Sequence, residues 1–421
     1  MRIILLFAII FVSLPICFIK PWIGVLIFSW LGYMNPHRFT WGTAYEFPFA
    51  KIVAVVTILG LLITRDRMPL PKTRETILII LLGLYFTATN FFAFNPYAAW
   101  DQWEKVIKIL VMTLVTMMLI NNPKKMKYFV MVVAFSIGFL GIKGGIFSFM
   151  TGGEYRVFGP AASFFQDNND MALALNMTLP LLFFLAKEET NRKLKMFFWL
   201  TFIFGIVSVI FTYSRGGFLT LAGVSTLLLL RAKYKTFGVL FISAALIIGM
   251  SYIPGKWFER IETIKSYEQD RSAMGRINAW RTALNIAKDR PLTGGGFETF
   301  TWQVFARYAP NPNDVHDVHS VYFEVLGEHG FVAFGLFIAL MLSTLLKTHR
   351  IGKISRANPE LKWFQNYSSM LQISILAYMM GGVFLGRAYF DLFYHVVAMV
   401  VILHTLFEKA QQSKHEAGFA S

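Results

Sequence analysis

The chain has 421 residues, of which 56% are apolar and only 15% charged, and its mean hydropathy is +0.53. Because ordinary globular domains carry about 25% charged residues, this composition excludes a soluble protein and indicates an all-α integral membrane protein. Cys17 is the single cysteine, which excludes an internal disulfide and a multi-cysteine metal site. The net charge of +16 is expected on loops at one side of a membrane, so no nucleic-acid partner is inferred.

Apolar runs long enough to form or approach a membrane-spanning helix recur along the whole chain. They cover residues 3–19, 22–34, 49–63, 76–94, 106–120, 128–150, 171–186, 194–213, 218–230, 237–253, 321–346, 369–385 and 390–407. Lys20 and Pro21 break the first stretch, so residues 1–34 cross either once or twice, and we favour one net crossing. This reading predicts about twelve spans with both termini in the cytoplasm.

Loops rich in Lys and Arg alternate with loops that hold fewer cations or balance them with acids. The cation-rich loops contain Arg65 to Arg74, Lys124 to Lys127, Lys187 to Lys195, Arg231 to Lys235 and Lys347 to Lys362. The positive-inside rule places these loops in the cytoplasm and the others on the far side. We therefore divide the chain into an N-terminal transmembrane bundle (1–193), core transmembrane helices (194–253), a large outer loop (254–320), and C-terminal transmembrane helices with a cytoplasmic tail (321–421).

The outer loop contains a predicted amphipathic helix at residues 275–290, suited to lie on the membrane interface. Three glycines at 294–296 end it. Their backbone N–H groups could form an anion-binding nest, although a plain loop is the more common meaning of such a triplet.

Arginines near the outer surface are the first candidates for function, because charges at membrane depth are costly. Arg215 lies in a predicted short turn at 214–217, where it could bind an anionic substrate or snorkel to lipid phosphate. Arg156 is similar but has Glu154 nearby. Arg387, Tyr389 and Asp391 form a third group, in which Arg387 could pair with Asp391 or contact substrate.

Histidines stand where the outer loop returns to the membrane. His319 could act as a general base, or it could bind a metal together with His316 and Asp317, which one helical turn would bring together. A purely structural histidine is the third alternative. Downstream, Glu324 and Glu328 are predicted to be buried and partnered. Together the outer cations suit a lipid-linked phosphate or pyrophosphate, which arginine binds in a bidentate manner.

Four motifs in order give the chain a resemblance to the O-antigen ligase and polymerase superfamily of bacterial inner-membrane glycosyltransferases. They are YSRG (213–216), GRINAW (275–280), RPLTGGGF (290–297) and HSVYFEVLGEHG (319–330). Residues 156–175 also resemble a subgroup of O-glycosylation ligases associated with exopolysaccharide and exosortase systems. Ser320 stands where many relatives have Asn.

The resemblance implies a C-type glycosyltransferase-like fold with its active site on the periplasmic side. It implies inverting transfer of a glycan from undecaprenyl pyrophosphate to a hydroxyl acceptor, without a metal or other cofactor. The expected acceptor is the lipid A-core oligosaccharide, in lipopolysaccharide biosynthesis. His319 would be the catalytic base. The pyrophosphate would be bound by Arg215, Arg276, Arg156 and Arg387. Supporting residues would be His316, Tyr213, Tyr389 and Asp391.

Two alternatives share this fold, an O-antigen polymerase and a protein O-oligosaccharyltransferase. An anion transporter is a third alternative from another class of protein. The absence of inverted repeats and the placement of cations on one side count against it.

Overall fold

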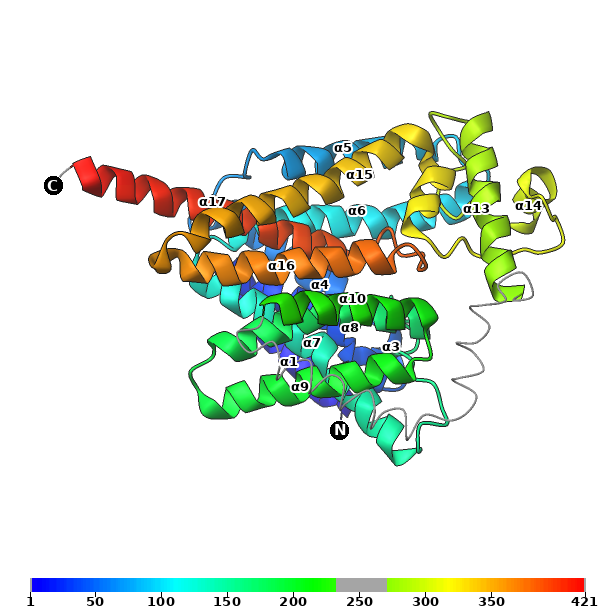
Figure 1. Cartoon of the computed structure of the whole chain (residues 1–421). Coiled ribbons are helices and arrows are strands. Elements are labelled where there is room, and N and C mark those ends of the chain that lie inside the picture. The colour runs from blue at the N-terminus through cyan, green and yellow to red at the C-terminus, as the bar shows by residue number, and fades with distance from the viewer. Residues whose placement is uncertain (1, 232–270, 420–421) are drawn as a thin grey trace.

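The computed structural model describes residues 2–231 and 271–419, and every regular element in these ranges is a helix (Figure 1). The predicted span at 237–253 and residues 254–270 of the outer loop lie outside the described residues. The α-helices are α1 (Arg2–Ile19), α2 (Pro21–Met34), α3 (Thr43–Glu46), α4 (Phe49–Ile63), α5 (Arg74–Asn90), α6 (Pro96–Leu119), α7 (Pro123–Met150), α8 (Asn168–Glu188), α9 (Arg192–Phe211), α10 (Arg215–Arg231), α13 (Arg271–Asp289), α14 (Trp302–Tyr308), α15 (Val321–Arg356), α16 (Lys362–Gly381) and α17 (Asp391–Phe419). Two short 3-10 helices are η1 (Pro36–Phe39) and η3 (Pro359–Leu361).

Six of the described helices are long and apolar enough to cross a membrane, namely α1, α7, α8, α9, α15 and α17. The chain is thus a helical protein of membrane type, while the predicted total of about twelve crossings remains a prediction. Each apolar run within the described residues forms a helix. The run at 106–120 is only part of one, because α6 already begins at Pro96, where proline is favoured in the first helical turn.

The centre of the bundle is formed by α8 and α17, whose apolar windows are 89% and 83% buried. Around them, α7 packs closely against α9. A β-carbon at Gly138 would lie 2.5 Å from Cγ2 of Thr201, and one at Gly141 would lie 3.2 Å from Cα of Gly205. Small residues repeated on one helix face let two backbones approach, which favours helix association within a membrane.

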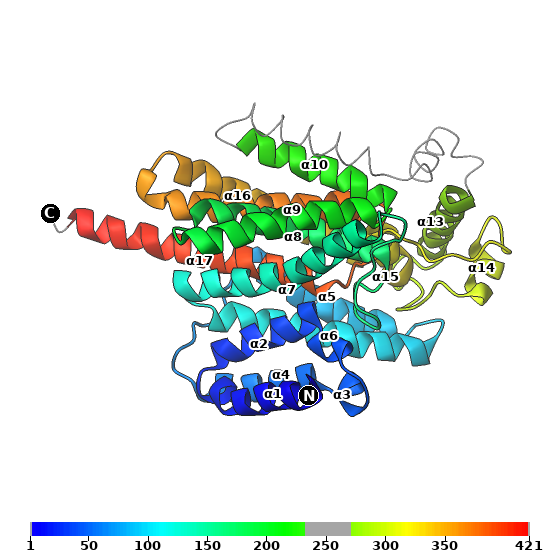
Figure 2. The same ribbon diagram turned by 90° about the horizontal axis from the view of Figure 1, so that it is seen from below.

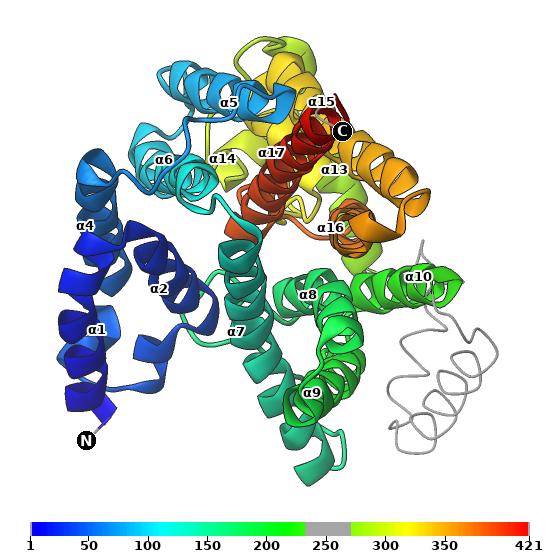
Figure 3. The ribbon, with the colours of Figure 1, turned by 90° about the vertical axis from the view of Figure 1, so that its left-hand side faces the viewer.

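The N-terminal helices α1, α2 and α4 lie together at one side of the bundle (Figures 2 and 3). The predicted break is confirmed, because α1 ends at Ile19 and α2 begins at Pro21. Cys17 packs with residues of α1, α2 and α4 in a small apolar core that is separate from the main core. Only 17% of the apolar window of α1 is buried, so most of its surface is available to lipid.

At the end of the bundle opposite the C-terminus, α13 and α14 extend beyond the other helices (Figure 1). The predicted amphipathic helix is present as α13, which packs against α15, and the ring of Trp280 stacks on Phe323 with their centroids 5.1 Å apart. The position of α13 on the membrane interface stays a prediction.

The interior of α15 is interrupted at Gly330, whose φ is 75°. The glycine triplet docks on this interruption. The N–H of Gly295 donates to the carbonyl of Gly327 (2.9 Å) and that of Gly296 to Glu328 (2.7 Å). The anion-nest interpretation was therefore wrong, because two of the three amides are used to hold the loop against α15.

Candidate active site

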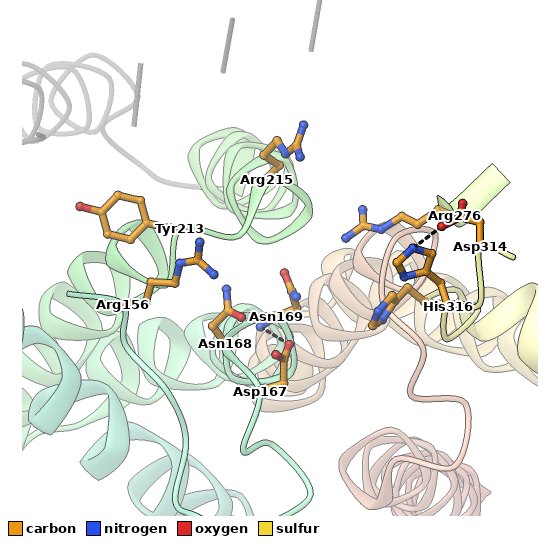
Figure 4. Close-up of a pocket in the computed structure, with 10 residues that line it drawn as sticks. Arg156, Asp167, Asn168, Asn169, Tyr213, Arg215, Arg276, Asp314 and His316 are labelled. Atoms are coloured by element: carbon orange, nitrogen blue, oxygen red, sulfur yellow. Dashed lines mark hydrogen bonds and ion pairs between the residues drawn. The ribbon is translucent and has the colours of Figure 1, made fainter. Parts of the chain in front are cut away.

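A pocket of about 630 Å³ lies at the end of the bundle where α10 begins. Its walls come from the segment before α8, the start of α8, the α9–α10 turn, α13 and the loop before α15 (Figure 4). Its lining residues are Arg156, Asp167, Asn168, Asn169, Tyr213, Arg215, Arg276, Asp314, His316 and His319. Six of them were predicted from the sequence, namely Arg156, Tyr213, Arg215, Arg276, His316 and His319.

The start of α8 contributes a polar wall that sequence reasoning did not assign to the site. Asp167 caps α8 by accepting a hydrogen bond from the N–H of Asn169 (2.8 Å). The side-chain amide of Asn168 donates to the carbonyl of Thr212 (2.7 Å), which ties α8 to the α9–α10 turn. The available signal was a run of polar residues, 167–170, directly before an apolar helix.

Arg215 is the first residue of α10, so the short turn predicted at 214–217 was wrong from Arg215 onward. Ser214 lies directly before it, and its hydroxyl accepts a hydrogen bond from the N–H of Gly217 (3.0 Å). A Ser side chain at this position stabilises a helix start. Because the N-terminus of a helix carries partial positive charge, α10 adds to the cationic character of the pocket wall at Arg215.

Tyr213, in the same turn, has a left-handed backbone (φ 56°) and donates its hydroxyl to the carbonyl of Gly153. This bond joins the turn to the loop that carries Arg156. Such a backbone costs a non-glycine residue about 1–2 kcal/mol, and strained residues concentrate at functional sites.

The GRINAW motif on α13 organises the opposite wall. A β-carbon at Gly275 would lie 2.4 Å from Cδ2 of His316, so only glycine leaves room for that ring. The side-chain amide of Asn278 donates to the carbonyls of Asn311 and Asp314, both at 2.9 Å. Nε1 of Trp280 donates to the carbonyl of Val318 (2.8 Å). The motif thus fixes the loop that carries His316 and His319, while Arg276 lines the pocket.

The loop before α15 is irregular from Asp314 to Ser320, so His316, Asp317 and His319 do not share a helical turn. The premise of the metal-binding alternative was therefore wrong. His316 pairs with Asp314 (Nε2 to Oδ1, 2.8 Å), while Nδ1 of His319 lies 3.8 Å from Oδ2 of Asp317. Within residues 2–231 and 271–419, no three His, Cys, Asp or Glu side chains are grouped to hold a metal ion.

His319 combines a left-handed backbone (φ 42°) with partial burial. Burial lowers its pKa from the ordinary 6.5. The charges of Arg276 and His316 lower it as well, against the opposing effect of Asp317 and Asp167. At neutral pH the imidazole is therefore largely uncharged, which is the form that accepts a proton.

The third predicted group lies outside the lining of the pocket. Arg387 forms an ion pair with Asp170 of α8, so the suggested pairing with Asp391 was wrong. Tyr389 is buried and donates its hydroxyl to Glu328. Asp391 is buried at the start of α17.

Glu328 is buried, Glu324 is half-buried, and both are partnered as predicted. Glu324 accepts a hydrogen bond from the N–H of Ala388 (2.8 Å), and Glu328 accepts one from the N–H of Glu298 (2.8 Å). The bond from Ala388, together with that from Tyr389 to Glu328, ties residues 386–390 to α15 beside the loop that carries His319. A β-carbon at Gly386 would lie 3.2 Å from Cα of His319.

Comparison with protein families divides the chain into two parts. Residues 200–338 match the model described as O-Antigen ligase, and residues 1–190 match a family of unknown function (DUF5935). No curated protein matches the chain. The first match contains Arg215, Arg276, His316 and His319, whereas Arg156 lies in the second and Arg387 in neither.

Proposed function

We propose a specific reaction for this chain. Through residues 200–338 the chain belongs to the O-antigen ligase superfamily, whose general function is glycosyl transfer of the ligase or polymerase type. The donor is a glycan on undecaprenyl pyrophosphate, and the acceptor is a hydroxyl of the lipid A-core oligosaccharide. The observation that carries the proposal is the meeting of three arginines and His319 in one pocket, although they come from separate parts of the chain.

In this reaction Arg215 and Arg276 bind the pyrophosphate, and Arg156 supports them from the facing loop. A guanidinium presents paired N–H donors that fit two phosphate oxygens. Because negative charge on the pyrophosphate grows as it leaves, fixed cations stabilise the transition state more than the bound donor. Such cations supply the charge stabilisation for which other enzymes use a divalent metal.

His319 acts as the general base. Its neutral imidazole takes the proton of the acceptor hydroxyl, whose oxygen attacks the anomeric carbon of the glycan. The bond between that carbon and the pyrophosphate oxygen breaks, its electron pair leaves with the pyrophosphate, and the anomeric centre inverts. Asp317 stabilises the imidazolium that forms, and the proton then passes to solvent.

The proposed topology puts this pocket on the periplasmic side of the bacterial inner membrane, following the alternation of cation-rich loops. Single cysteines at Glu154 and Asn313, which are exposed, should react with an impermeant thiol reagent in spheroplasts. Cysteines at Lys124 and Ala357, also exposed, should not. The native Cys17 is buried and serves as the background. Reversed labelling would overturn the topology.

Transfer by the purified full-length protein tests the reaction itself. The lipid-linked glycan is offered with lipid A-core, with a second lipid-linked chain, or with a Ser/Thr peptide. Product on lipid A-core supports the proposal, whereas product on the second chain or on the peptide identifies a polymerase or a protein oligosaccharyltransferase. Anion flux into liposomes without any product would identify a transporter. Loss of activity in EDTA, with recovery in Mg²⁺, would contradict the metal-independent mechanism.

A further inference from the structure

A second pocket, of about 290 Å³, lies at the opposite end of α10 from the candidate active site. Arg215, the first residue of α10, lines the first pocket, and Arg231, the last residue of α10 that the structure describes, lines the second. A helix of 17 residues is about 25 Å long at 1.5 Å per residue. The remaining walls come from α15 and α16 near the connection between them, at the end away from α13 and α14 (Figure 1). We call it the far-end pocket.

The far-end pocket is lined by cations and neutral polar groups. Its charged or chargeable side chains are Arg231, His349, Lys353 and Arg356, and no carboxylate is among its lining residues in the described part of the chain. The active-site pocket differs, because Asp167 and Asp314 lie among its cations. A concave surface of one sign concentrates ions of the opposite sign.

Three of these side chains share one face of α15. His349, Lys353 and Arg356 follow each other at intervals of four and three residues, which places them in one row on a helix. All three are exposed. The like charges of Lys353 and Arg356, which are neighbours on the helix surface, destabilise the helix, and an anion bound between them offsets that repulsion.

Arg231 is held in position by α16. Its guanidinium donates to the hydroxyl of Ser369 and to Oε1 of Gln372 (2.7 Å). Arg231 and Arg356 line the same pocket. Burial, and after it the charge of Arg356, lower the pKa of Arg231. With two of its five N–H groups engaged by neutral partners, Arg231 keeps both its charge and donors for a ligand.

The close approach of α15 and α16 fixes the floor of the pocket. A β-carbon at Gly352 would lie 2.8 Å from Oγ of Ser368, so glycine is what lets the helices meet here. The cations therefore project from a helix pair with a fixed backbone, so a ligand has to order only their side chains.

We propose that the far-end pocket binds a phosphate-bearing anion between Arg231 and Arg356, with Lys353 as a third cation. A phosphate has enough acceptor oxygens and negative charge to pair with two guanidinium groups at once, whereas a carboxylate has only two oxygens and one charge. The phosphate belongs either to the headgroup of an anionic lipid, since basic pockets between transmembrane helices bind such headgroups, or to a soluble phosphate compound.

The test uses the purified full-length protein in neutral detergent and three probes: short-chain phosphatidylglycerol, short-chain phosphatidylcholine and inorganic pyrophosphate. Two double variants are compared. Lys353→Gln with Arg356→Gln removes two cations from the pocket. Arg350→Gln with Lys362→Gln removes two exposed cations from the same helices outside it. Dissociation constants come from thermophoresis, and melting temperatures without ligand check the fold of each variant.

We expect the first double variant to weaken binding of the preferred anion about thirtyfold, from the contribution of each cation near an anionic surface. The second should weaken it less than about threefold. The probe whose binding the first double variant weakens identifies the ligand of the far-end pocket. Weakened binding of phosphatidylglycerol assigns the pocket to a lipid headgroup, and weakened binding of pyrophosphate assigns it to a soluble compound. Equal losses in both double variants, or no anion binding to the wild type, overturn the proposal. Both double variants keep the candidate active site, so any pyrophosphate bound there contributes equally to the two measurements.

Discussion

Two neighbouring regions of this protein contain the same kinds of side chain but use them differently. The active-site pocket brings arginines and His319 to a common open space. The adjoining cluster around residues 386–391 directs its polar groups inward, with Arg387 on Asp170 and Tyr389 on Glu328. Under the proposed function, an arginine near the membrane surface is a substrate ligand or a structural tie depending on which distant segment folds beside it.

The two regions are expected to respond differently to substitution. Changes in the pocket should lower transfer while the melting temperature stays the same, because half-exposed pocket residues contribute little to packing. Changes in the cluster should lower stability first, since removing one partner leaves another polar group buried. The following predictions test that contrast.

The largest effect is expected for His319→Ala. Removal of a general base lowers the rate by about 10²–10⁴-fold, so transfer should fall about a thousandfold. Binding of the lipid-linked donor should stay nearly unchanged, because the base acts in the chemical step. Single-turnover transfer and donor affinity are measured on the same preparation.

His316→Ala is the matched control, because His316 lines the same pocket but pairs with Asp314. Its loss should be about tenfold at most, as expected for a residue that tunes charge without moving the proton. If the His316 and His319 variants lose equal activity, the assignment of His319 as the base is wrong.

Arg215→Lys should reduce kcat/KM about a hundredfold although it keeps the positive charge. Lysine cannot present two parallel donors to the pyrophosphate, and a charge-assisted hydrogen bond is worth about 1.5–3 kcal/mol. The melting temperature should stay within error of wild type. Unchanged kcat/KM in a well-folded variant would show that Arg215 anchors the protein to lipid.

Arg387→Gln should act on stability instead. It leaves Asp170, whose side chain is 9% exposed, without its cation, and we expect a loss of about 2 kcal/mol since Arg387 itself is partly exposed. Arg307→Gln is the control, because its pair with Asp289 is exposed on both sides. A raised donor KM at unchanged melting temperature would restore Arg387 as a pyrophosphate ligand.

Hydropathy was sufficient to predict the long apolar helices, because it is a property of short segments. The four motifs were found by their resemblance to a known family. Partners from distant segments could not be predicted this way. Asp170, which pairs with Arg387, lies 217 positions away along the chain. The predicted outer loop does include residues 314–320, but the metal-binding alternative assumed a helical turn there, because His316 and His319 have the spacing of one, and the segment is irregular. The hydrogen bonds from Asn278 and Trp280 of α13 hold this loop in place instead.

The smallest predicted effect concerns pH and the carboxylate beside the base. His319 accepts a proton only when neutral, and its pKa lies below the ordinary 6.5. Transfer should therefore be nearly constant above neutral pH and fall on acidification, with a midpoint below that of a free imidazole.

Asp317→Asn should move this midpoint further down, since Asp317 raises the pKa of His319. The plateau rate should fall as well, because the imidazolium loses its stabilising carboxylate. Asp314→Asn provides the control, because Asp314 pairs with His316, whose charge lowers the pKa of His319. Removing Asp314 should leave the midpoint in place or raise it. The measurement is kcat/KM between pH 5 and 8 for wild type and both variants, a range about the ordinary histidine pKa. A midpoint that moves down equally in both variants would mean that the overall charge of the pocket, rather than the Asp317 carboxylate, controls His319.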